Sequence, residues 1–377
     1  MSAIDSYVAD LAFEHDLSLP LARKLASLAI YALDDSHDPE APAALADPDV
    51  AWTYVQGPLG IYADDASADR LERFASDVID KGFDVAGAWF ARGCVAERRG
   101  DLAGAERHYA AALERDGEYW PASSSLGFLA FARGEVTAGR QLLRDADSAH
   151  GRRMLHLLDH VDQLRPERNA PCACGSGRKT KVCCGEASVS PDFEAGWLWD
   201  KAALWLHRLP QAARFVDAAC RLADLERDAG DRLVHAVRVP LMDSLALFEH
   251  GLLDRFAHDF GPLLRETERA TLASWRDVTH RIWEVRDTEP GYTLTLVDLA
   301  SGAEVTAQNG SVSCCTRPGE LVYAAVLPSR DGRWLLPCHP LCLDDDVADV
   351  YADLLEHGVD PLLVAKGLLA GEYDATM

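Results

Sequence analysis

The chain has 377 residues, of which 48% are hydrophobic and 26% are charged. This length exceeds one ordinary hydrophobic core and the composition is that of a folded protein, so we expect on the order of two to four domains. The formal net charge of −24 disfavours general binding to nucleic acid and to anionic membranes, because both repel an acidic surface.

The N-terminal residues do not suit a signal peptide, because Asp5, Asp10, Glu14 and Asp16 fall where a basic start and an apolar segment are required. No run of about eighteen uncharged apolar residues is found in the sequence, which predicts no membrane span. We therefore expect a cytoplasmic protein. In that reducing compartment its 10 cysteines are not expected to form a disulfide framework.

Residues 1–84 are predicted to form helices, and the proline-rich and acidic stretch 36–49 is predicted to be a loop. Residues 85–150 contain an internal repeat of 34 residues. The equivalent pairs are Gly93 and Gly127, Ala96 and Ala130, Gly100 and Gly134, and Ala112 and Ala146. Small residues at these positions allow the two helices of a hairpin to approach closely.

This pattern resembles the tetratricopeptide repeat (TPR), which implies a stack of helical hairpins with a concave face for a peptide. The second copy departs from the pattern, with Gly139 where alanine is usual and Leu143 in place of an aromatic residue. About three repeats are needed for a stable stack, so the upstream helices are expected to complete it. Phe90, Phe128 and Phe131 are predicted to line a groove for an amphipathic helix. The alternative is that these rings pack against flanking helices.

A small cysteine-rich module is predicted at residues 169–187. Cys172 and Cys174 precede a glycine-rich turn, and Cys183 and Cys184 follow it. Structural zinc sites need four tetrahedral ligands, and thiolates suit them. We therefore predict one Zn²⁺ held by these four cysteines, with metal binding supplying the folding energy of the module. A disulfide or a redox-active cysteine is the alternative, which strained geometry and a reducing compartment oppose.

The segment PCACGSGRKTKVCCG resembles the SEC-C motif, which is named for the C-terminal tail of the secretion motor ATPase SecA. The resemblance covers about fifteen residues and implies an interaction element rather than a catalyst. Arg178, Lys179 and Lys181, together with Arg165 and Arg168, are predicted to form a positive surface that meets an acidic peptide or RNA. The alternative is that these charges only balance the zinc thiolates.

Residues 192–276 are predicted to be helical, residues 280–343 to form a small β-barrel or meander, and residues 344–377 to form a helical tail. The predicted fold class is therefore α+β and multidomain. The β region is a candidate oligonucleotide-binding barrel. The candidate stacking rings, for which core packing is the alternative, are Trp283, Tyr292, Tyr323 and Trp334.

Cys338, His339 and Cys342, near Cys314 and Cys315, are candidates for a second metal site, because a Cys-His-x-x-Cys spacing suits metal ligation. No phosphate-binding GxxxxGK[ST] loop, HExxH helix or GxSxG elbow is present. The sequence as a whole predicts a non-catalytic zinc-binding adaptor with a protein partner. The alternatives are a nucleic-acid or ribosome-associated factor and an enzyme whose site lies in the β region.

Overall fold

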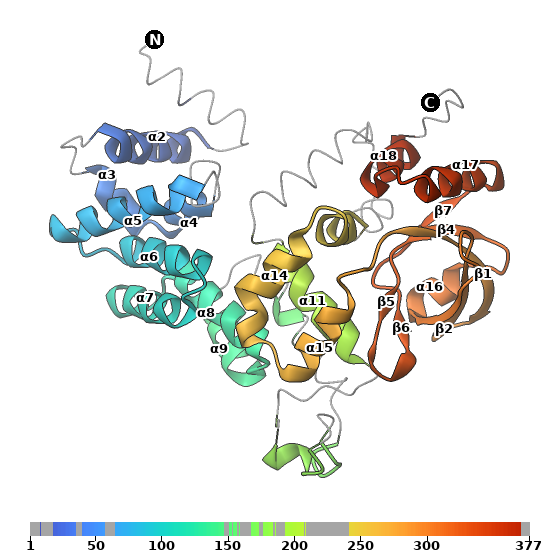
Figure 1. Ribbon diagram of the computed structural model, residues 1–377. Helices are drawn as coiled ribbons and strands as arrows, with labels where there is room; N and C mark the ends of the chain where they lie inside the picture. Colours follow the sequence, from blue (N-terminus) through green and yellow to red (C-terminus); the bar gives the residue numbers. More distant parts are fainter. Residues whose placement is uncertain are drawn as a thin grey trace. The chain divides into compact units, whose positions relative to one another are not determined.

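A computed structural model describes residues 18–34, 40–56, 65–146, 167–172, 176–183, 193–206 and 241–370, with a few isolated positions between them. The chain divides into two compact units, Met1–Gln163 and Leu164–Met377. The described part of the first unit is helical, and the second combines helices with a seven-stranded mixed sheet (Figure 1). The predicted α+β class is confirmed.

The helices of the first unit follow the period found in the sequence. Helix α6 begins at Ala86 and α8 at Trp120, while α7 begins at Leu102 and α9 at Val136, so each pair of starts is 34 residues apart. Helix α6 packs against α7, and α8 against α9. The helices are α2 (Leu19–Asp34), α3 (Glu40–Ala43), α4 (Pro48–Gln56), α5 (Asp65–Asp80), α6 (Ala86–Arg98), α7 (Leu102–Arg115), α8 (Trp120–Arg133) and α9 (Val136–Ala146).

The prediction of a loop at residues 36–49 is wrong for its described part. Glu40–Ala43 forms α3, Ala44–Ala46 forms a 3₁₀ turn, η1, and Pro48 begins α4. Proline is tolerated in the first turn of a helix, where its missing N–H would have no partner in any case. The described prolines of this stretch, Pro42 and Pro48, therefore lie in the first turns of helices rather than in an extended loop.

Glycines allow the helices of each hairpin to touch. A Cβ atom at Gly127 would lie 2.7 Å from Leu143 Cδ2, and a Cβ atom at Gly93 would overlap the ring of Tyr109. Leu143 follows Tyr109 by one repeat of 34 residues, so leucine fills the place of the aromatic ring in the second hairpin. The close helix approach predicted from the small residues is present in both hairpins.

Gly127→Ala is expected to lower the free energy of unfolding by about 1–3 kcal/mol, because the added methyl overpacks the helix crossing. Gly139→Ala in the facing helix is the matched control. Its Cβ would lie 3.4 Å from Gly127 O and 3.6 Å from Phe131 N, which is ordinary contact. Alanine is the better helix former, so a gain of about 0.5–1 kcal/mol is expected there. Urea titrations that show equal effects at the two positions would contradict the close crossing.

One contact in the first unit joins the segment before the repeats to the residue that precedes the second hairpin. The buried Tyr119 hydroxyl donates to Leu45 O at 3.1 Å, and a Cβ atom at Gly87 in α6 would overlap the same carbonyl. Burial raises the pKa of Tyr119 well above its ordinary value, so the hydroxyl keeps its proton. Trp52 in α4 lies against Trp120 at the start of α8, with ring centroids 5.0 Å apart. The segment before the repeats is thus bound to the second hairpin as well as the first.

The sheet of the second unit is built around an antiparallel meander. Strands β1 (Arg281–Glu289), β2 (Thr293–Asp298) and β3 (Glu304–Gln308) pair in sequence order, and the sheet order is β5-β6-β3-β2-β1-β4-β7. Strand β4 pairs antiparallel with β1, and β6 pairs parallel with β3. The remaining elements are α16 (Gly310–Cys315), β4 (Leu321–Ala324), β5 (Leu327–Pro328), η7 (Arg330–Gly332), β6 (Trp334–Leu335), β7 (Leu341–Leu343), α17 (Asp345–Glu356) and α18 (Pro361–Ala370).

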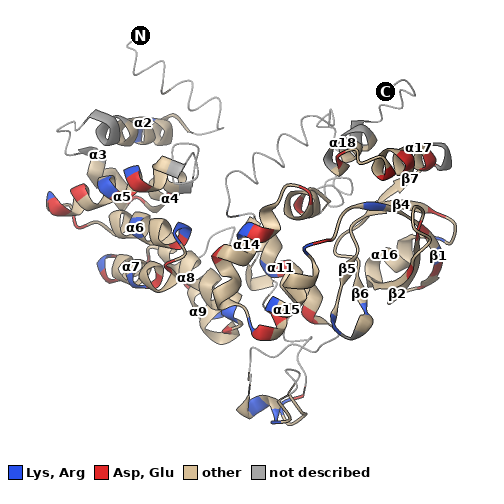
Figure 2. Ribbon diagram, viewed as in Figure 1, with Lys and Arg blue, Asp and Glu red and all other residues tan. Residues whose placement is uncertain are grey.

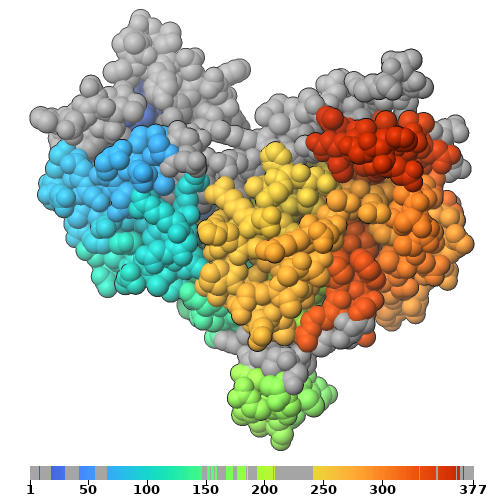
Figure 3. All heavy atoms as spheres, viewed as in Figure 1, coloured from blue at the N-terminus to red at the C-terminus, as the bar shows by residue number. Residues whose placement is uncertain are grey.

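The sheet is not closed, because no pairing joins its two end strands, β5 and β7, among the described residues. Of the two predicted forms, a barrel or a meander, the meander therefore describes strands β1–β3. One face of the sheet carries a core that includes Trp283, Leu296 and Val322. The other face, around Ile282 and Tyr323, is covered by a helix at residues 241–248 and by α17 and α18. Figure 3 shows the C-terminal helices, in red, lying against the region of the strands, in orange.

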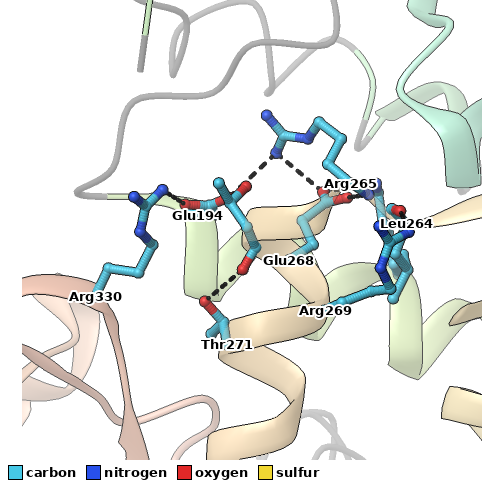
Figure 4. A network of polar contacts seen from close by, with 9 residues as sticks. Glu194, Leu264, Arg265, Glu268, Arg269, Thr271 and Arg330 are labelled. Atoms are coloured by element: carbon cyan, nitrogen blue, oxygen red, sulfur yellow. Dashed lines mark hydrogen bonds and ion pairs between the residues drawn. The ribbon is translucent and has the colours of Figure 1, made fainter. Parts of the chain in front are cut away.

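Buried charges connect the helices of this unit to the sheet. Helices α11 (Glu194–Leu206), α14 (Leu252–Phe260) and α15 (Glu266–Ser274) precede the strands. Lys201 Nζ in α11 lies 2.8 Å from Glu268 Oε1 in α15, with 1% and 0% of the side chains exposed. Arg265 reaches Glu268 at 3.0 Å, and Glu194 accepts from Arg330, which lies between β5 and β6 (Figure 4). This network fixes α11 and α15 against the β5–β6 edge.

Candidate metal centre

The backbone of the cysteine module reverses as its glycines predict. Pro171 and Lys179 form an antiparallel bridge, and the Cys172 N–H donates to Arg178 O at 2.7 Å. Gly177 lies at the turn with a φ of +73°, which glycine adopts without strain. Cys172 is thereby held on the first arm of a short hairpin, and only 4% of it is exposed.

A 3₁₀ turn, η3 (Thr180–Val182), carries the chain from the hairpin to Cys183. The Cys183 N–H donates to Thr180 O at 3.2 Å. The sulfur of Cys183 lies 3.1 Å from Ser176 Oγ, and Arg178 Nη2 donates to it at 3.2 Å. Cys174 and Cys184 lie outside the described residues. The described residues contain no group of three or more potential metal-ligating side chains.

The module has little apolar interior of its own. Within residues 167–172 and 176–183, only Cys172 and Thr180 are buried. Val182 is 61% exposed, which is unusual for a residue that a folded core normally encloses. A hairpin this small buries too little apolar area to be stable alone, and small modules of this kind are commonly stabilised by a bound metal or a disulfide. The hydroxyl of Ser176 and the guanidinium of Arg178 both lie within hydrogen-bonding distance of the Cys183 sulfur.

The module presents positive charge on an acidic protein. Arg168, Arg178, Lys179 and Lys181 are all exposed, and Figure 2 shows Lys and Arg along the described part of the module. Val182 lies beside Lys181 in the chain and is also exposed. Arg165, which the sequence places in the same surface, lies outside the described residues. The exposed residues of the described part of the module also include Glu167 and Pro171.

The three phenylalanines predicted to line a groove are buried. The exposed fractions are 0% for Phe90, 1% for Phe128 and 0% for Phe131. Phe90 packs against Tyr109 with ring centroids 5.9 Å apart, and Phe128 stacks on Phe131 at 6.3 Å. The close helix crossings leave these rings inside the hairpins, which favours the packing interpretation. They are therefore not proposed as a partner-binding surface.

The cysteines of the β region do not come together as a second metal site among the described residues. Cys338 is 4% exposed, and burial raises the pKa of its thiol to about 12. A thiol that keeps its proton is a poor metal ligand and a poor nucleophile. His339 Nε2 lies 3.4 Å from Ser311 Oγ, and Cys342 is exposed. These positions favour Cys338 as a core residue.

The aromatic residues of the β region have mixed roles. Trp283 and Tyr323 are buried, and the Trp283 Nε1–H donates to Ala324 O at 3.1 Å. Trp334 packs against the edge of the same core as Trp283. Tyr292 is 68% exposed at the β1–β2 turn. The core-packing alternative therefore applies to Trp283 and Tyr323, and Tyr292 remains a candidate for stacking on a base.

A buried polar pair between His280 and Glu249 is not evident from the sequence. His280 Nδ1 lies 2.8 Å from Glu249 Oε1, and the imidazole stacks on Tyr323 with ring centroids 5.3 Å apart. Glu249 also accepts the backbone N–H of His280 at 2.7 Å. Because Glu249 follows the helix at 241–248 and His280 precedes β1, the pair fixes that helix to the sheet.

None of the described helices combines the length and the apolar character required of a bilayer-spanning segment. No protein-family model, no curated protein and no solved structure matches this chain at a significant level. The function must therefore be argued from the residues and their geometry.

Proposed function

We propose that this protein is a non-catalytic, zinc-binding interaction protein. In this proposal, Cys172, Cys174, Cys183 and Cys184 hold one Zn²⁺, and the metal orders the module that carries the contact surface. The observation that supports it most is the hairpin around Cys172, with hydrogen-bond donors directed at Cys183 and little apolar interior. The resemblance to the SEC-C motif points the same way, since that motif mostly serves in interactions.

The proposed contact surface consists of Arg178, Lys179, Lys181 and Val182. Its charge is opposite to that of the chain as a whole, whose formal net charge is −24. A partner segment with carboxylates around one apolar residue would complement it, and opposite charge would speed association. In this proposal, the tetratricopeptide-like hairpins of the first unit act as a rigid scaffold. The alternative is that the cations serve only to offset the formal −2 charge of a four-thiolate zinc site.

A second candidate function is nucleic-acid binding, and the connections of the β region favour it. Strand β5 follows β4 after only Ala325 and Val326. If the two are taken as one bent strand, the order of a meander, a helix and two strands returning beside β1 and β3 is similar to the oligonucleotide-binding fold. Exposed Tyr292 lies in the β1–β2 turn, where that fold contacts its ligand.

The charge along strands β1 and β3 opposes nucleic-acid binding, the second candidate function. Exposed or half-exposed carboxylates line β1 and β3, namely those of Glu284, Asp287, Glu289 and Glu304. The cation Arg286 is already paired with Glu284 at 3.2 Å. Nucleic-acid grooves depend on lysine and arginine to neutralise phosphates, so an acidic face repels the strand. We therefore favour a protein partner.

The double variant Lys179→Glu/Lys181→Glu tests the contact surface. Binding of two fluorescent probes, an Asp/Glu-rich peptide with one central leucine and a single-stranded RNA, would be followed by anisotropy at several salt concentrations. We expect salt-dependent peptide binding that weakens at least about tenfold in the double variant. Lys81→Glu, a charge reversal in the first unit, is the control and should bind as the wild type does.

Three outcomes are distinct. RNA binding that disappears in the double variant would support the nucleic-acid candidate. Binding of neither probe would leave the cations with the role of balancing thiolate charge. Peptide binding that is unchanged in the double variant would place the contact elsewhere and contradict the proposed surface.

A further inference from the structure

Two polar side chains from one short turn converge on a single cysteine of the module. Ser176 Oγ lies 3.1 Å from Cys183 Sγ, and Arg178 Nη2 lies 3.2 Å from the same sulfur. The Arg178 N–H also donates to Ser176 Oγ, at 3.4 Å. The serine oxygen therefore accepts from the backbone on one side and faces the sulfur on the other.

The direction of the serine contact follows from the state of the sulfur. A cysteine that binds a metal is a thiolate, which has no proton and can only accept hydrogen bonds. Ser176 must then donate its hydroxyl proton to Cys183, and the guanidinium of Arg178 supplies a second, charged donor. Both donors reduce the charge density on this sulfur and fix the direction in which its remaining lone pairs point.

The backbone of the hairpin holds Ser176 and Arg178 in position. Arg178 O accepts from the Cys172 N–H at 2.7 Å, so the residue that supplies the guanidinium is joined to the first cysteine. Gly177, between the two donors, has the positive φ that the turn requires. The turn therefore places both groups beside Cys183, and little ordering entropy is lost when a metal is bound.

We propose that Ser176 and Arg178 are positioning residues for the metal site, which act through Cys183 to set the affinity for Zn²⁺ and the rate of its release. This inference rests on the proposed function, since it requires that the module binds zinc. It goes beyond that function by assigning specific roles within the basic segment. Lys179, the next residue, is exposed and pairs with Pro171 through its main chain, so its charge alone is not expected to matter as much.

The test measures Zn²⁺ affinity of the full-length protein by competition with a chromophoric chelator. Ser176→Ala and Arg178→Gln are each expected to weaken binding about 10- to 100-fold, the usual effect of removing a partner that orients a metal ligand. Ser176→Thr keeps the hydroxyl and should bind nearly as the wild type does. Arg178→Lys keeps the charge but loses the planar fork, and an intermediate affinity is expected.

Lys179→Gln is the matched control, because it removes one positive charge from the neighbouring position. It is expected to weaken binding by less than about threefold, as a surface charge screened by solvent would. Co²⁺ loading gives a second readout, since the sulfur-to-cobalt charge-transfer bands should persist in Ser176→Ala and Arg178→Gln. Their persistence would show that all four thiolates still bind the metal.

Two failures are distinguishable. Equal losses in Arg178→Gln and Lys179→Gln, or wild-type affinity in Ser176→Ala, would overturn this inference and leave the zinc site intact. A wild-type protein that binds neither Zn²⁺ nor Co²⁺ would instead refute the proposed function.

Discussion

Full-length protein is expected to contain about one zinc ion per chain when purified without chelators, and Cys183→Ser is expected to lose it. A thiolate ligand replaced by a hydroxyl leaves three sulfurs, which bind zinc far more weakly. Structural zinc supplies about 10 kcal/mol to small modules of this kind, so the loop around Ser176 should become labile to proteolysis. Metal content by mass spectrometry and limited proteolysis measure the two effects.

Cys315→Ser is the control for the zinc prediction, because Cys315 is exposed at the end of α16. It should retain the metal. Thermal unfolding of the helices in the first unit should be the same in both variants, since that unit is compact by itself. Metal-free wild-type protein with a protease-resistant loop would refute the zinc site, and a second zinc retained in Cys183→Ser would refute the assignment of a single site.

Lys201→Met is expected to lower the free energy of unfolding of the second unit by about 3–5 kcal/mol. The methionine fills the space, but Glu268 then stays buried without its ammonium partner at 2.8 Å. Burial alone would raise the pKa of Glu268, yet Lys201 and Arg265 together lower it to about 2. Urea titrations followed by tryptophan fluorescence measure the loss, because Trp197 and Trp205 lie in the same helix as Lys201.

The pH dependence of stability gives a second readout of the same pair. The pKa of Glu268 in the folded protein lies below its ordinary value of 4.5, so its stabilisation is complete above pH 4.5 and is lost as the pH falls toward 2. The full effect corresponds to about 3 kcal/mol. In Lys201→Met this dependence should be weaker, because the main cation beside the carboxylate is gone.

Arg286→Met removes an exposed cation from the same unit and should change the unfolding free energy by less than about 0.5 kcal/mol. The double variant Lys201→Met/Glu268→Leu removes both charges and should recover part of the loss. The buried pair would contribute little if Lys201→Met were as stable as Arg286→Met and lost stability at acid pH as the wild type does.

Local patterns in the sequence predict the features that depend on local geometry. The 34-residue spacing of small residues predicts helix pairs because a glycine such as Gly93 is needed wherever two helices touch. Short β-rich runs separated by turn residues predict the meander. The β-rich run at residues 320–328 reads as one strand in the sequence, but Ala325 and Val326 divide it into β4 and β5. Helix α16 was not predicted, although Asn309 caps its start by accepting from the Val312 N–H at 3.0 Å.

Features that depend on distant residues could not be predicted. Lys201 and Glu268 are 67 positions apart, and nothing near either residue indicates that they meet in a buried pair. The sequence left two interpretations of Phe90 open, a groove and core packing, because its burial depends on rings of other helices such as Trp52 and Tyr109. The cysteine module differs, because Ser176, Arg178 and Cys183 lie within eight consecutive residues and the motif itself places them together.

The contact between Tyr119 and Leu45 limits how this protein can change length. Arrays in which each hairpin meets only its neighbours tolerate the gain or loss of a whole unit. Here the carbonyl of Leu45 accepts from Tyr119, and Gly87 leaves the space that this carbonyl needs. Deleting residues 86–119 would remove both residues and leave the carbonyl without its donor, so the first hairpin cannot be lost without changing the segment before it.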